Sequence, residues 1–267
     1  MLSINRLGNL GRLANQMFQY ASLKGIATNR GYSFCIPPRE AFGSQDNLVS
    51  QSDTTIYDVF KNIENNNIGF QNNQTLWERR HEFDKEIFVN CPDNVDLVGY
   101  FQTEKYFKHI EDEIRKDFTF SKEITETCKE VYNDVIGENE SISLHIRRSD
   151  YTVNPNHPTQ PIEYYDKALR HYDAKIPVFV FSDDPSWCHE QELFSDDRFM
   201  VSDNNTTEFD LCLMSMCTYH IIANSSFSWW GAWLAKSKKI IAPKNWFAAE
   251  CSNKSIQDVP FGDFTFL

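Results

Sequence analysis

Two adjacent arginines carry the strongest chemical signal in the sequence. Arg147 and Arg148 stand in the run Leu-His-Ile-Arg-Arg-Ser-Asp at residues 144–150, directly after a stretch that is typical of a strand. Ligands of parallel sheets bind beyond the carboxyl ends of strands, and guanidinium groups fork onto phosphate oxygens. The pair could therefore neutralise a diphosphate, with Asp150 orienting one arginine. A structural ion pair at a domain surface is the alternative.

A serine-rich run at residues 224–231, Asn-Ser-Ser-Phe-Ser-Trp-Trp-Gly, forms a second candidate anion site. It too lies between an expected strand and an expected helix. Hydroxyls and N–H groups at a helix N-terminus bind anions, so this location suits a diphosphate. The alternative is N-capping of the helix by Ser226 or Ser228. We expect the tryptophans of the run to pack the helix onto the sheet.

An acidic pair, Asp183 and Asp184, follows a third expected strand. A carboxylate there could accept hydrogen bonds from the N–H groups of guanine. For Asp184, the simpler interpretation is that it caps a helix that starts at Pro185. For Asp183, both the contact with guanine and a capping role remain open. The first loop, with Gly8 and Gly11, lacks the GxGxxG pattern and is a weak phosphate signal by itself.

The sequence offers no recognisable metal site. It contains no DxD triplet, no HExxH and no CxxC, and its seven cysteines are scattered. This cysteine usage fits reduced thiols better than a disulfide framework or a zinc site. Arginines and a helix end would then have to stabilise a leaving diphosphate.

Charge and hydropathy narrow the class of protein further. The chain of 267 residues has 38 acidic against 26 basic residues, a net charge of −12. Such a chain is a poor binder of nucleic acids in general. We see no signal-peptide h-region and no apolar stretch long enough to span a membrane. We therefore expect a cytoplasmic protein whose membrane contact is peripheral at most, at the inner membrane surface.

The expected elements place these motifs at strand ends. A strand at 2–7, a glycine loop and a helix from about Asn15 to Gly31 open the chain, and a strand follows at 95–101. The polar segment 43–75 is interpreted as loop-rich, with one short helix around 56–60. Two helical patterns follow the strand at 95–101, and their apolar faces contain Tyr106, Ile110, Ile114 and Phe118, and then Ile124, Cys128, Val131 and Val135.

From residue 139 onward, strands and helices alternate regularly. Strands are expected at 141–146, 178–181, 198–201, 219–223 and 239–242, and helices at 161–172, 185–193, 207–217 and 228–235. The helix at 207–217 is expected to open at Thr207, with Asp210 three residues on. Strands separated by helices form parallel sheets with covered faces. We predict two α/β domains, residues 1–137 and 138–267.

Six motifs, in this order, resemble those of the α1,2-fucosyltransferase family of bacteria and animals. They are GRLANQMFQYA at 11–21, GYFQTEKYF at 99–107, HIRRSD at 145–150, FSDD at 181–184, NSSFSWW at 224–230 and IAPKNWF at 241–247. One departure is Ala14, where the family usually has glycine; the added methyl could tighten a loop that meets the donor. The segment 43–75 is the least family-like region, and acceptor specificity is expected there.

The resemblance implies a GT-B-like fold, with two Rossmann-type domains facing across a cleft. It implies inverting, metal-independent transfer from GDP-fucose, with no cofactor, by a C-terminal donor domain and an N-terminal acceptor-side domain. By resemblance, Arg147, Asp150 and His145 are catalytic, Arg147 at the β-phosphate. The donor-binding residues implied are Arg148, Asp183, Ser225, Ser226 and Phe227, together with Arg12, Asn15 and Gln16 from the N-terminal domain.

The acceptor implied is galactose at the end of an oligosaccharide, including a lipid-linked O-antigen or capsule repeat. Asp150, Glu163 and His145 are candidates for a general base that removes the acceptor proton. Three rival functions stay open: a non-catalytic nucleotide-sugar sensor, a protein O-fucosyltransferase, and a hydrolase using Ser226 and His145.

Overall fold

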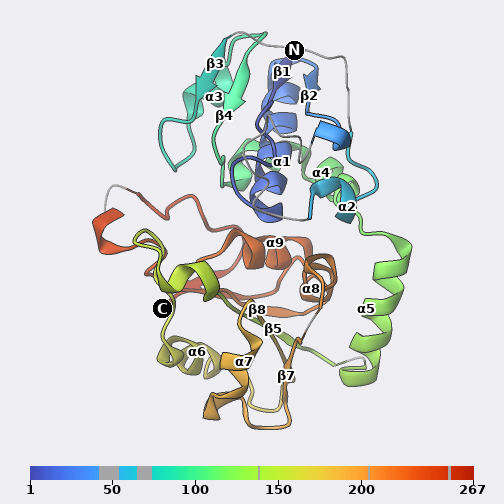
Figure 1. Ribbon diagram of the computed structural model, residues 1–267, viewed down its shortest axis with the longest axis vertical. Helices are drawn as coiled ribbons and strands as arrows, with labels where there is room; N and C mark the ends of the chain where they lie inside the picture. Colours follow the sequence, from blue (N-terminus) through green and yellow to red (C-terminus); the bar gives the residue numbers. More distant parts are fainter. Residues whose placement is uncertain (42–53, 65–73, 138, 204, 252–253) are drawn as a thin grey trace. The chain divides into compact units, whose positions relative to one another are not determined.

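The computed structural model describes residues 1–41, 54–64, 74–137, 139–203, 205–251 and 254–267 (Figure 1). These residues form two compact units: unit 1 comprises Met1–Ser121 with Lys254–Val259, and unit 2 comprises Lys122–Asn253 with Pro260–Leu267. The division falls before the expected boundary near Gly137. Helix α5 (Lys122–Val135) belongs to unit 2 because it packs on α8 (Thr207–Met214), where the thiol of Cys128 lies 3.6 Å from the carbonyl oxygen of Phe209.

Unit 1 is built on a parallel sheet with the strand order β2-β1-β4-β3. Its strands are β1 (Leu2–Ser3), β2 (Phe34–Cys35), β3 (Thr75–Trp77) and β4 (Asp96–Val98). The strands expected at 2–7 and 95–101 are therefore confirmed but shorter. After β1 the chain turns away, because the carboxylate of Asp96 accepts hydrogen bonds from the Ser3 hydroxyl at 3.1 Å and from the backbone N–H of Asn5 at 2.7 Å.

Helix α1 (Leu13–Arg30) is the central helix of unit 1 (Figure 1). It begins two residues before the expected start and ends at Arg30, and the residue that caps it, Gly31, adopts a left-handed conformation with φ of 68°. The N–H of Gly31 bonds to Thr28, and the next N–H bonds to Ala27, which satisfies two of the final carbonyls. The interior of the helix is almost entirely buried, so α1 forms the core against which the sheet packs.

The remaining helices of unit 1 are short. They are α2 (Ile56–Val59), α3 (Lys85–Asn90) and α4 (Glu111–Asp117), with 3-10 turns η1 (Arg39–Ala41), η2 (Glu104–Tyr106) and η3 (Lys108–Ile110). The short helix expected around 56–60 is confirmed, while most of the polar segment around it lies outside the described residues. The first of the two expected apolar faces is buried as predicted, although its four residues are shared among η2, η3, α4 and Phe118 after it. The second expected face is only partly confirmed, because Cys128 is buried but Val135 is 42% exposed.

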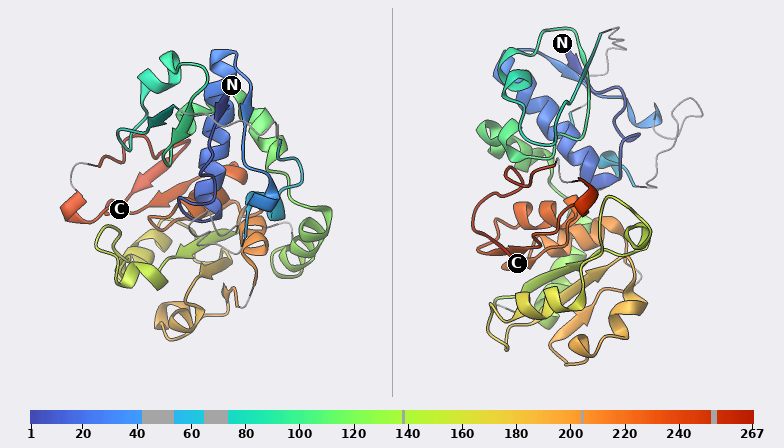
Figure 2. Two further views of the ribbon diagram at one scale, coloured as in Figure 1. Left: turned by 45° about the horizontal axis from the view of Figure 1, so that its top comes forward. Right: turned by 90° about the vertical axis from the view of Figure 1, so that its left-hand side faces the viewer.

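Unit 2 contains a second parallel sheet, whose strands are drawn as arrows in Figure 2. The order of its strands is β10-β9-β8-β5-β6-β7. Its strands are β5 (Ile142–Ile146), β6 (Val178–Ser182), β7 (Phe199–Val201), β8 (Tyr219–Ile221), β9 (Ile240–Ala242) and β10 (Phe264–Phe266). The helices are α5, α6 (Ile162–Leu169), α7 (Pro185–His189), α8 and α9 (Ser226–Leu234), with 3-10 turns η4 (Ser149–Thr152), η5 (Glu192–Phe194) and η6 (Ala249–Cys251). The predicted alternation is confirmed; β10 was not predicted.

The core of unit 2 lies around its central strand. Every residue of β5 is buried, and Trp229, Trp230 and Trp233 of α9 are almost fully buried, as expected for packing residues. Helices α8 and α9 approach closely at Gly231, where a side-chain Cβ would lie 2.9 Å from the Cβ of Met214. Glycine at this position therefore permits the contact between the two helices.

The strand order places a topological switch point between β5 and β8. From β5 the chain proceeds outward through β6 and β7, and it then crosses to the other side of β5 to form β8, β9 and β10. The loops that leave adjacent strands in opposite directions open a crevice at the carboxyl ends, where ligands bind in such sheets. Arg147 follows β5 directly, and the serine-rich run follows β8.

Among the described residues, no helix combines the length and the apolar character needed to cross a bilayer.

Candidate functional site

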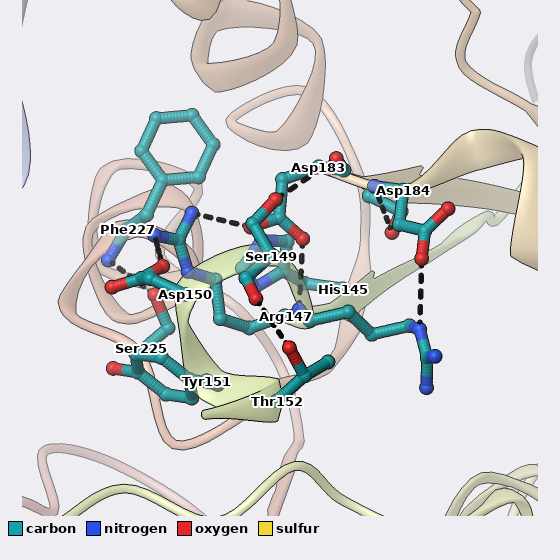
Figure 3. Close-up of polar contacts among 12 residues, drawn as sticks. His145, Arg147, Ser149, Asp150, Tyr151, Thr152, Asp183, Asp184, Ser225 and Phe227 are labelled. Carbon is teal, nitrogen blue, oxygen red and sulfur yellow. Dashed lines mark hydrogen bonds and ion pairs between the residues drawn. The ribbon is translucent and has the colours of Figure 1, made fainter. Parts of the chain in front are cut away.

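Three of the predicted motifs converge at the carboxyl edge of the unit 2 sheet (Figure 3). His145 is the fourth residue of β5, and Arg147 opens the loop after it. Asp183 and Asp184 follow β6, the neighbouring strand on one side. Ser225 and Phe227 stand at the start of α9, beyond β8 on the other side.

Arg147 is held by carboxylates on two sides. Its Nη1 atom lies 2.7 Å from Oδ2 of Asp183, and its Nη2 atom contacts Oδ1 of Asp150. The guanidinium also lies over the ring of Tyr151, 5.3 Å from its centroid. A guanidinium has five N–H donors, so two carboxylate contacts leave donor capacity for a ligand anion. The site thus presents a cation whose orientation is fixed before any ligand binds.

Arg148 turns toward the other acidic residue. Its Nε atom donates to Oδ2 of Asp184 at 3.0 Å, and its guanidinium stacks on Trp187, 4.2 Å from the ring centroid. Asp184 also accepts a hydrogen bond from the backbone N–H of Trp187 at 3.2 Å, which confirms its predicted role as the cap of α7. The two arginine side chains therefore diverge and pair with different aspartates.

Asp183 fixes the loop that carries both arginines. One carboxylate oxygen pairs with Arg147, and the other accepts the backbone N–H of Arg148 at 2.8 Å. The carbonyl oxygen of Asp183 also accepts a hydrogen bond from the Ser149 hydroxyl at 3.2 Å. These contacts assign Asp183 a positioning role at β5; its expected contact with guanine stays a prediction.

His145 is buried beneath the loop and neutral at physiological pH. Its Nδ1 atom lies 3.0 Å from the Ser228 hydroxyl, and its ring centroid lies 5.7 Å from that of Phe227. Burial lowers the pKa of His145 to about 4; the nearby Arg147 adds to this effect and Asp183 opposes it. The partner of this imidazole is Ser228, whereas the hydrolase alternative required Ser226.

The N-terminus of α9 is capped by Ser225, whose hydroxyl accepts the backbone N–H of Phe227 at 3.3 Å. The expectation that Ser226 or Ser228 caps this helix is wrong. The helix was expected to begin at Ser228 but begins at Ser226, so the capping residue is the preceding Ser225. Tyr151, which stacks against Arg147, donates its hydroxyl to the carbonyl of Asn224 at 3.2 Å. This bond connects the arginine loop to the serine-rich run.

Asn224 is a structural centre of the site that the sequence analysis did not identify. Its buried side chain donates to the carbonyl oxygens of Pro158 and Trp246, both at 3.0 Å, and accepts from Gln160 at 3.1 Å. It therefore joins the segments after η4 and β9 to the end of β8. Its place between an apolar strand and two serines was a signal that could have identified it.

Asp210 is a second residue with a role that sequence reasoning missed. The cap of α8 is Thr206, not Thr207, and the carboxylate of Asp210 instead accepts the Ser202 hydroxyl at 2.6 Å. Burial raises the pKa of Asp210 to about 6. Ser202 directly follows β7, so this pair lies at the same sheet edge as the arginines, two strands and about 10 Å from β5.

The other predicted donor-binding residues lie in unit 1, at the start of α1. Arg12 occupies the N-cap position, and Asn15 accepts the amide of Gln102 at 2.6 Å. Gln16 is buried, and its Oε1 atom accepts the backbone N–H of Ile56 at 3.1 Å. Its Nε2 atom has no partner among the described residues. Contact of these three residues with a donor stays a prediction.

No group of three or more His, Cys, Asp or Glu side chains in the described part of the chain is arranged to hold a metal ion. The charge that the site offers to an anion comes from its guanidinium groups and from the helix N-terminus.

Comparison with known proteins agrees with this architecture. The sequence pattern of glycosyl transferase family 11 matches residues 3–260. The chain is 34% identical over 267 aligned positions to an alpha-1,2-colitosyltransferase of Escherichia coli, covering 90% of this chain and 91% of that protein. It is 26% identical to galactoside alpha-(1,2)-fucosyltransferase 2 of Sus scrofa, covering 98% of this chain and 75% of that protein. It is also similar to the O-antigen biosynthesis glycosyltransferase WbnK of Escherichia coli, with 35% identity over 65% of this chain and 63% of that protein.

Solved structures show the same fold. The α-1,6-fucosyltransferase NodZ, co-crystallized with GDP, aligns with a TM-score of 0.57 and 15% identity over 91% of this chain and 95% of its own. POFUT1 in complex with GDP aligns with a TM-score of 0.51 and 13% identity over 99% of this chain and 97% of its own. The fold is therefore GT-B, with a parallel α/β sheet in each unit, as predicted.

Proposed function

The chain belongs to glycosyl transferase family 11, and from this premise we propose that it transfers L-fucose from GDP-fucose to the 2-hydroxyl of a galactoside in a surface glycan. The proposal depends on one observation: the Arg147 guanidinium is held between Asp183 and Asp150 at the switch point of the unit 2 sheet. Relatives over most of the chain act as alpha-1,2-fucosyl- or alpha-1,2-colitosyltransferases by name, which supports the linkage.

The diphosphate of the donor would bind between Arg147 and the N-terminus of α9. The first N–H groups of a helix have no intrahelical partner, and the helix dipole favours a negative charge there. Ser225 and Ser226 add hydroxyl donors at the same place. As the bond between fucose and the diphosphate breaks, negative charge grows on the β-phosphate, and a cation already in position stabilises it without reorganisation.

Guanine would bind at the ends of β6 and β7. Asp210 offers a carboxylate there, and guanine presents two adjacent N–H donors that match the two carboxylate oxygens. Both oxygens of Asp183 already serve Arg147 and Arg148, so we assign the base contact to Asp210 with Ser202. The purine would lie one or two strands from the diphosphate, a separation that the strand spacing provides.

The reaction would be a single displacement that inverts the anomeric carbon. The acceptor oxygen bonds to C1 of fucose while GDP leaves with the electron pair of the broken bond. The cationic side chain and the helix end supply the charge stabilisation of the leaving group, so the scheme needs no metal ion. His145, neutral and bonded to Ser228, would hold the arginine loop and the start of α9 in register.

One incubation tests the proposal. Purified protein with GDP-fucose and lactose should release GDP and form a disaccharide extended by α1,2-linked fucose, identified by NMR of the product. GDP binding without release would instead indicate a nucleotide-sugar sensor. No binding of GDP would reject the proposal outright.

A second donor has support from one comparison, the colitosyltransferase at 34% identity. Colitose is L-fucose without its 3-hydroxyl, so the same pocket could accept either sugar. Competition between GDP-fucose and GDP-colitose in one assay gives the ratio of kcat/KM values. An array of galactose-terminated glycans, including lipid-linked repeats, then identifies the acceptor.

A further inference from the structure

Tyr151 contacts both parts of the candidate anion site in unit 2. It belongs to the 3-10 turn η4, which follows the two arginines, and it is half-buried. The Arg147 guanidinium lies over its ring, 5.3 Å from the centroid. Its hydroxyl donates to the carbonyl oxygen of Asn224 at 3.2 Å, and the next residue, Ser225, is the N-cap of α9. One side chain therefore joins the cation to the backbone that leads into the helix N-terminus.

The orientation of the Tyr151 ring is fixed by a second segment of unit 2. The His157 ring stacks on it, with centroids 5.2 Å apart and an angle of 20° between the two planes. Pro158, the next residue, has its carbonyl oxygen bonded to the side chain of Asn224. Turning the Tyr151 ring away from Arg147 would break the stacking on His157 as well as the hydrogen bond to Asn224. The ring is thus a fixed surface for the guanidinium.

The contact between Arg147 and Tyr151 has the geometry of a cation–π interaction, which acts within about 6 Å of a ring centroid. Such a contact is stronger where water is excluded, and only 16% of the Arg147 side chain is exposed. Of the five N–H donors of this guanidinium, two meet carboxylates. The aromatic face adds no carboxylate oxygen that competes with a phosphate for the other donors. Tyr151 can therefore hold Arg147 while a ligand anion binds it.

A neutral partner suits this position better than a third carboxylate. Asp183 and Asp150 already place two negative charges beside the one positive charge of Arg147 (Figure 3). Another carboxylate would weaken the attraction for a diphosphate, whereas the quadrupole of a ring attracts the cation and leaves its charge intact. The contact with Asp150 is also a weak restraint, because 47% of the Asp150 side chain is exposed and solvent screens such a pair. Tyr151 therefore orients Arg147 without lowering the net charge of the site.

We propose that Tyr151 is a positioning residue for fucosyl transfer: its ring holds the Arg147 guanidinium, and its hydroxyl ties that ring to Asn224, directly before the N-cap of α9. This inference rests on the proposed function and adds a residue to it. As GDP leaves, the cation and the helix N-terminus stabilise the same growing charge, so their separation affects the rate. Tyr151 sets this separation because it contacts both, and it touches no reacting atom itself.

Two substitutions separate the ring of Tyr151 from its hydroxyl. Tyr151→Leu removes the aromatic face, so with GDP-fucose and lactose its kcat should fall by about 10- to 30-fold. Its KM for lactose should stay near the wild-type value, because the lost orientation matters most when charge develops on the leaving group. Tyr151→Phe keeps the ring over Arg147 and should recover most of the loss in kcat.

A series of fluorinated phenylalanines at position 151 tests the cation–π contact with the shape of the side chain retained, and it serves if Tyr151→Leu does not fold. Fluorine withdraws electron density from the face of the ring, so each added fluorine weakens its attraction for a cation. The value of kcat should therefore fall stepwise along the series, at a nearly constant melting temperature. A ring that only fills space would give the same kcat throughout.

Tyr172→Leu is the matched control. Tyr172 also lies beneath a cation, with Nζ of Lys239 5.1 Å from its ring centroid, and its hydroxyl lies 3.5 Å from a backbone carbonyl oxygen, that of Lys239. Lys239 directly precedes β9, so this pair lies at the amino edge of the unit 2 sheet, opposite the edge with the arginines. Tyr172→Leu should lower the melting temperature and leave kcat near the wild-type value.

A double substitution shows whether Tyr151 acts through Arg147. In the Arg147→Ala background, Tyr151→Leu should reduce kcat little further, because the side chain that it positions is gone. The same fold-loss in both backgrounds would show that Tyr151 acts independently of Arg147 and would overturn the positioning role.

The remaining outcomes distinguish this inference from the proposed function. A wild type that transfers no fucose overturns the proposed function and the role of Tyr151 with it. An active wild type overturns the role of Tyr151 alone if a folded Tyr151→Leu retains wild-type kcat, or if kcat is constant along the fluorinated series.

Discussion

The Nη1 atom of Arg147 lies 2.7 Å from Oδ2 of Asp183, so the residue that leaves β5 is fixed by the residue that leaves β6. The ion pair joins the ends of two neighbouring parallel strands. It is mostly shielded from water, since 16% of the Arg147 side chain and 20% of the Asp183 side chain are exposed. The orientation of the guanidinium is thus a property of the sheet and not of a mobile side chain.

Replacing Asp183 with asparagine should separate its positioning role from a contact with guanine. The variant loses the negative charge beside Arg147, so its affinity for GDP should stay the same or increase. Its kcat should fall by about 10-fold or more, because the guanidinium is less well oriented. Calorimetry with GDP and initial-rate kinetics give the two values. A weakened GDP affinity with normal kcat would instead support the guanine contact predicted from the sequence.

The reciprocal prediction concerns Asp210. If its carboxylate binds guanine, Asp210→Asn should bind GDP about 10- to 100-fold more weakly, because a hydrogen-bonded base edge loses one acceptor. Binding of ADP, which lacks these donors, should hardly change. Titration of both nucleotides against wild type and variant measures the discrimination. Equal losses for GDP and ADP would contradict recognition of the base by Asp210.

Asn224 should contribute strongly to stability. Asn224→Ala removes three hydrogen bonds and leaves the carbonyls of Pro158 and Trp246 without this donor. We expect the free energy of unfolding to fall by about 2–4 kcal/mol, measured by urea denaturation. Asn90→Ala, on an exposed helix of unit 1, is the matched control and should change it by less than about 0.5 kcal/mol. Similar values for the two variants would show that Asn224 does not hold the loops.

The buried imidazole of His220 should make the free energy of unfolding depend on pH. It is buried, with Nδ1 2.8 Å from the Ser237 hydroxyl and Nε2 2.9 Å from the Met214 carbonyl oxygen, and burial lowers the pKa of His220 to about 4. An unfolded histidine has a pKa of about 6.5. Between these values the unfolded chain binds a proton that the folded chain does not, so stability is lost as the pH falls.

The measurement compares the wild type with His220→Gln by denaturant unfolding across this range. The wild-type advantage in the free energy of unfolding should be constant above about pH 6.5 and should shrink toward pH 4. Asp210, whose raised pKa gives the opposite slope, is common to both proteins and cancels in the difference. An advantage that grows in acid would contradict a neutral buried imidazole.

The features that depend on local sequence pattern could be predicted from the sequence. Alternating strands and helices after residue 139, the burial of the α9 tryptophans and the positions of Arg147 and Asp183 at strand ends all follow from periodicity and turn residues. The order of the strands does not, because pairing of β5 with β8 and of β9 with β10 joins segments that are distant in the chain. The sequence could therefore predict that the parallel sheet has a switch point, but not between which two strands it lies.

Side-chain partners were harder to predict than positions. Three serines are candidates for the N-cap of α9, and only the backbone geometry shows that Ser225 is the cap. Glu78 resembles an ordinary surface residue after a short strand. Its carboxylate nevertheless accepts the backbone N–H groups of Tyr100 and Phe101. These contacts form because Gly99 leaves room for the close approach and Phe101 adopts a left-handed conformation.

The central claim is that Arg147 stabilises the leaving diphosphate, and Arg147→Ala tests it most directly. In the assay with GDP-fucose and lactose, kcat/KM should fall by about 10²-fold or more, with a melting temperature close to that of the wild type. Arg147→Lys, which keeps the charge but loses the fork onto two oxygens, should recover only part of the rate. Near-wild-type turnover by Arg147→Ala would contradict the role assigned to this residue.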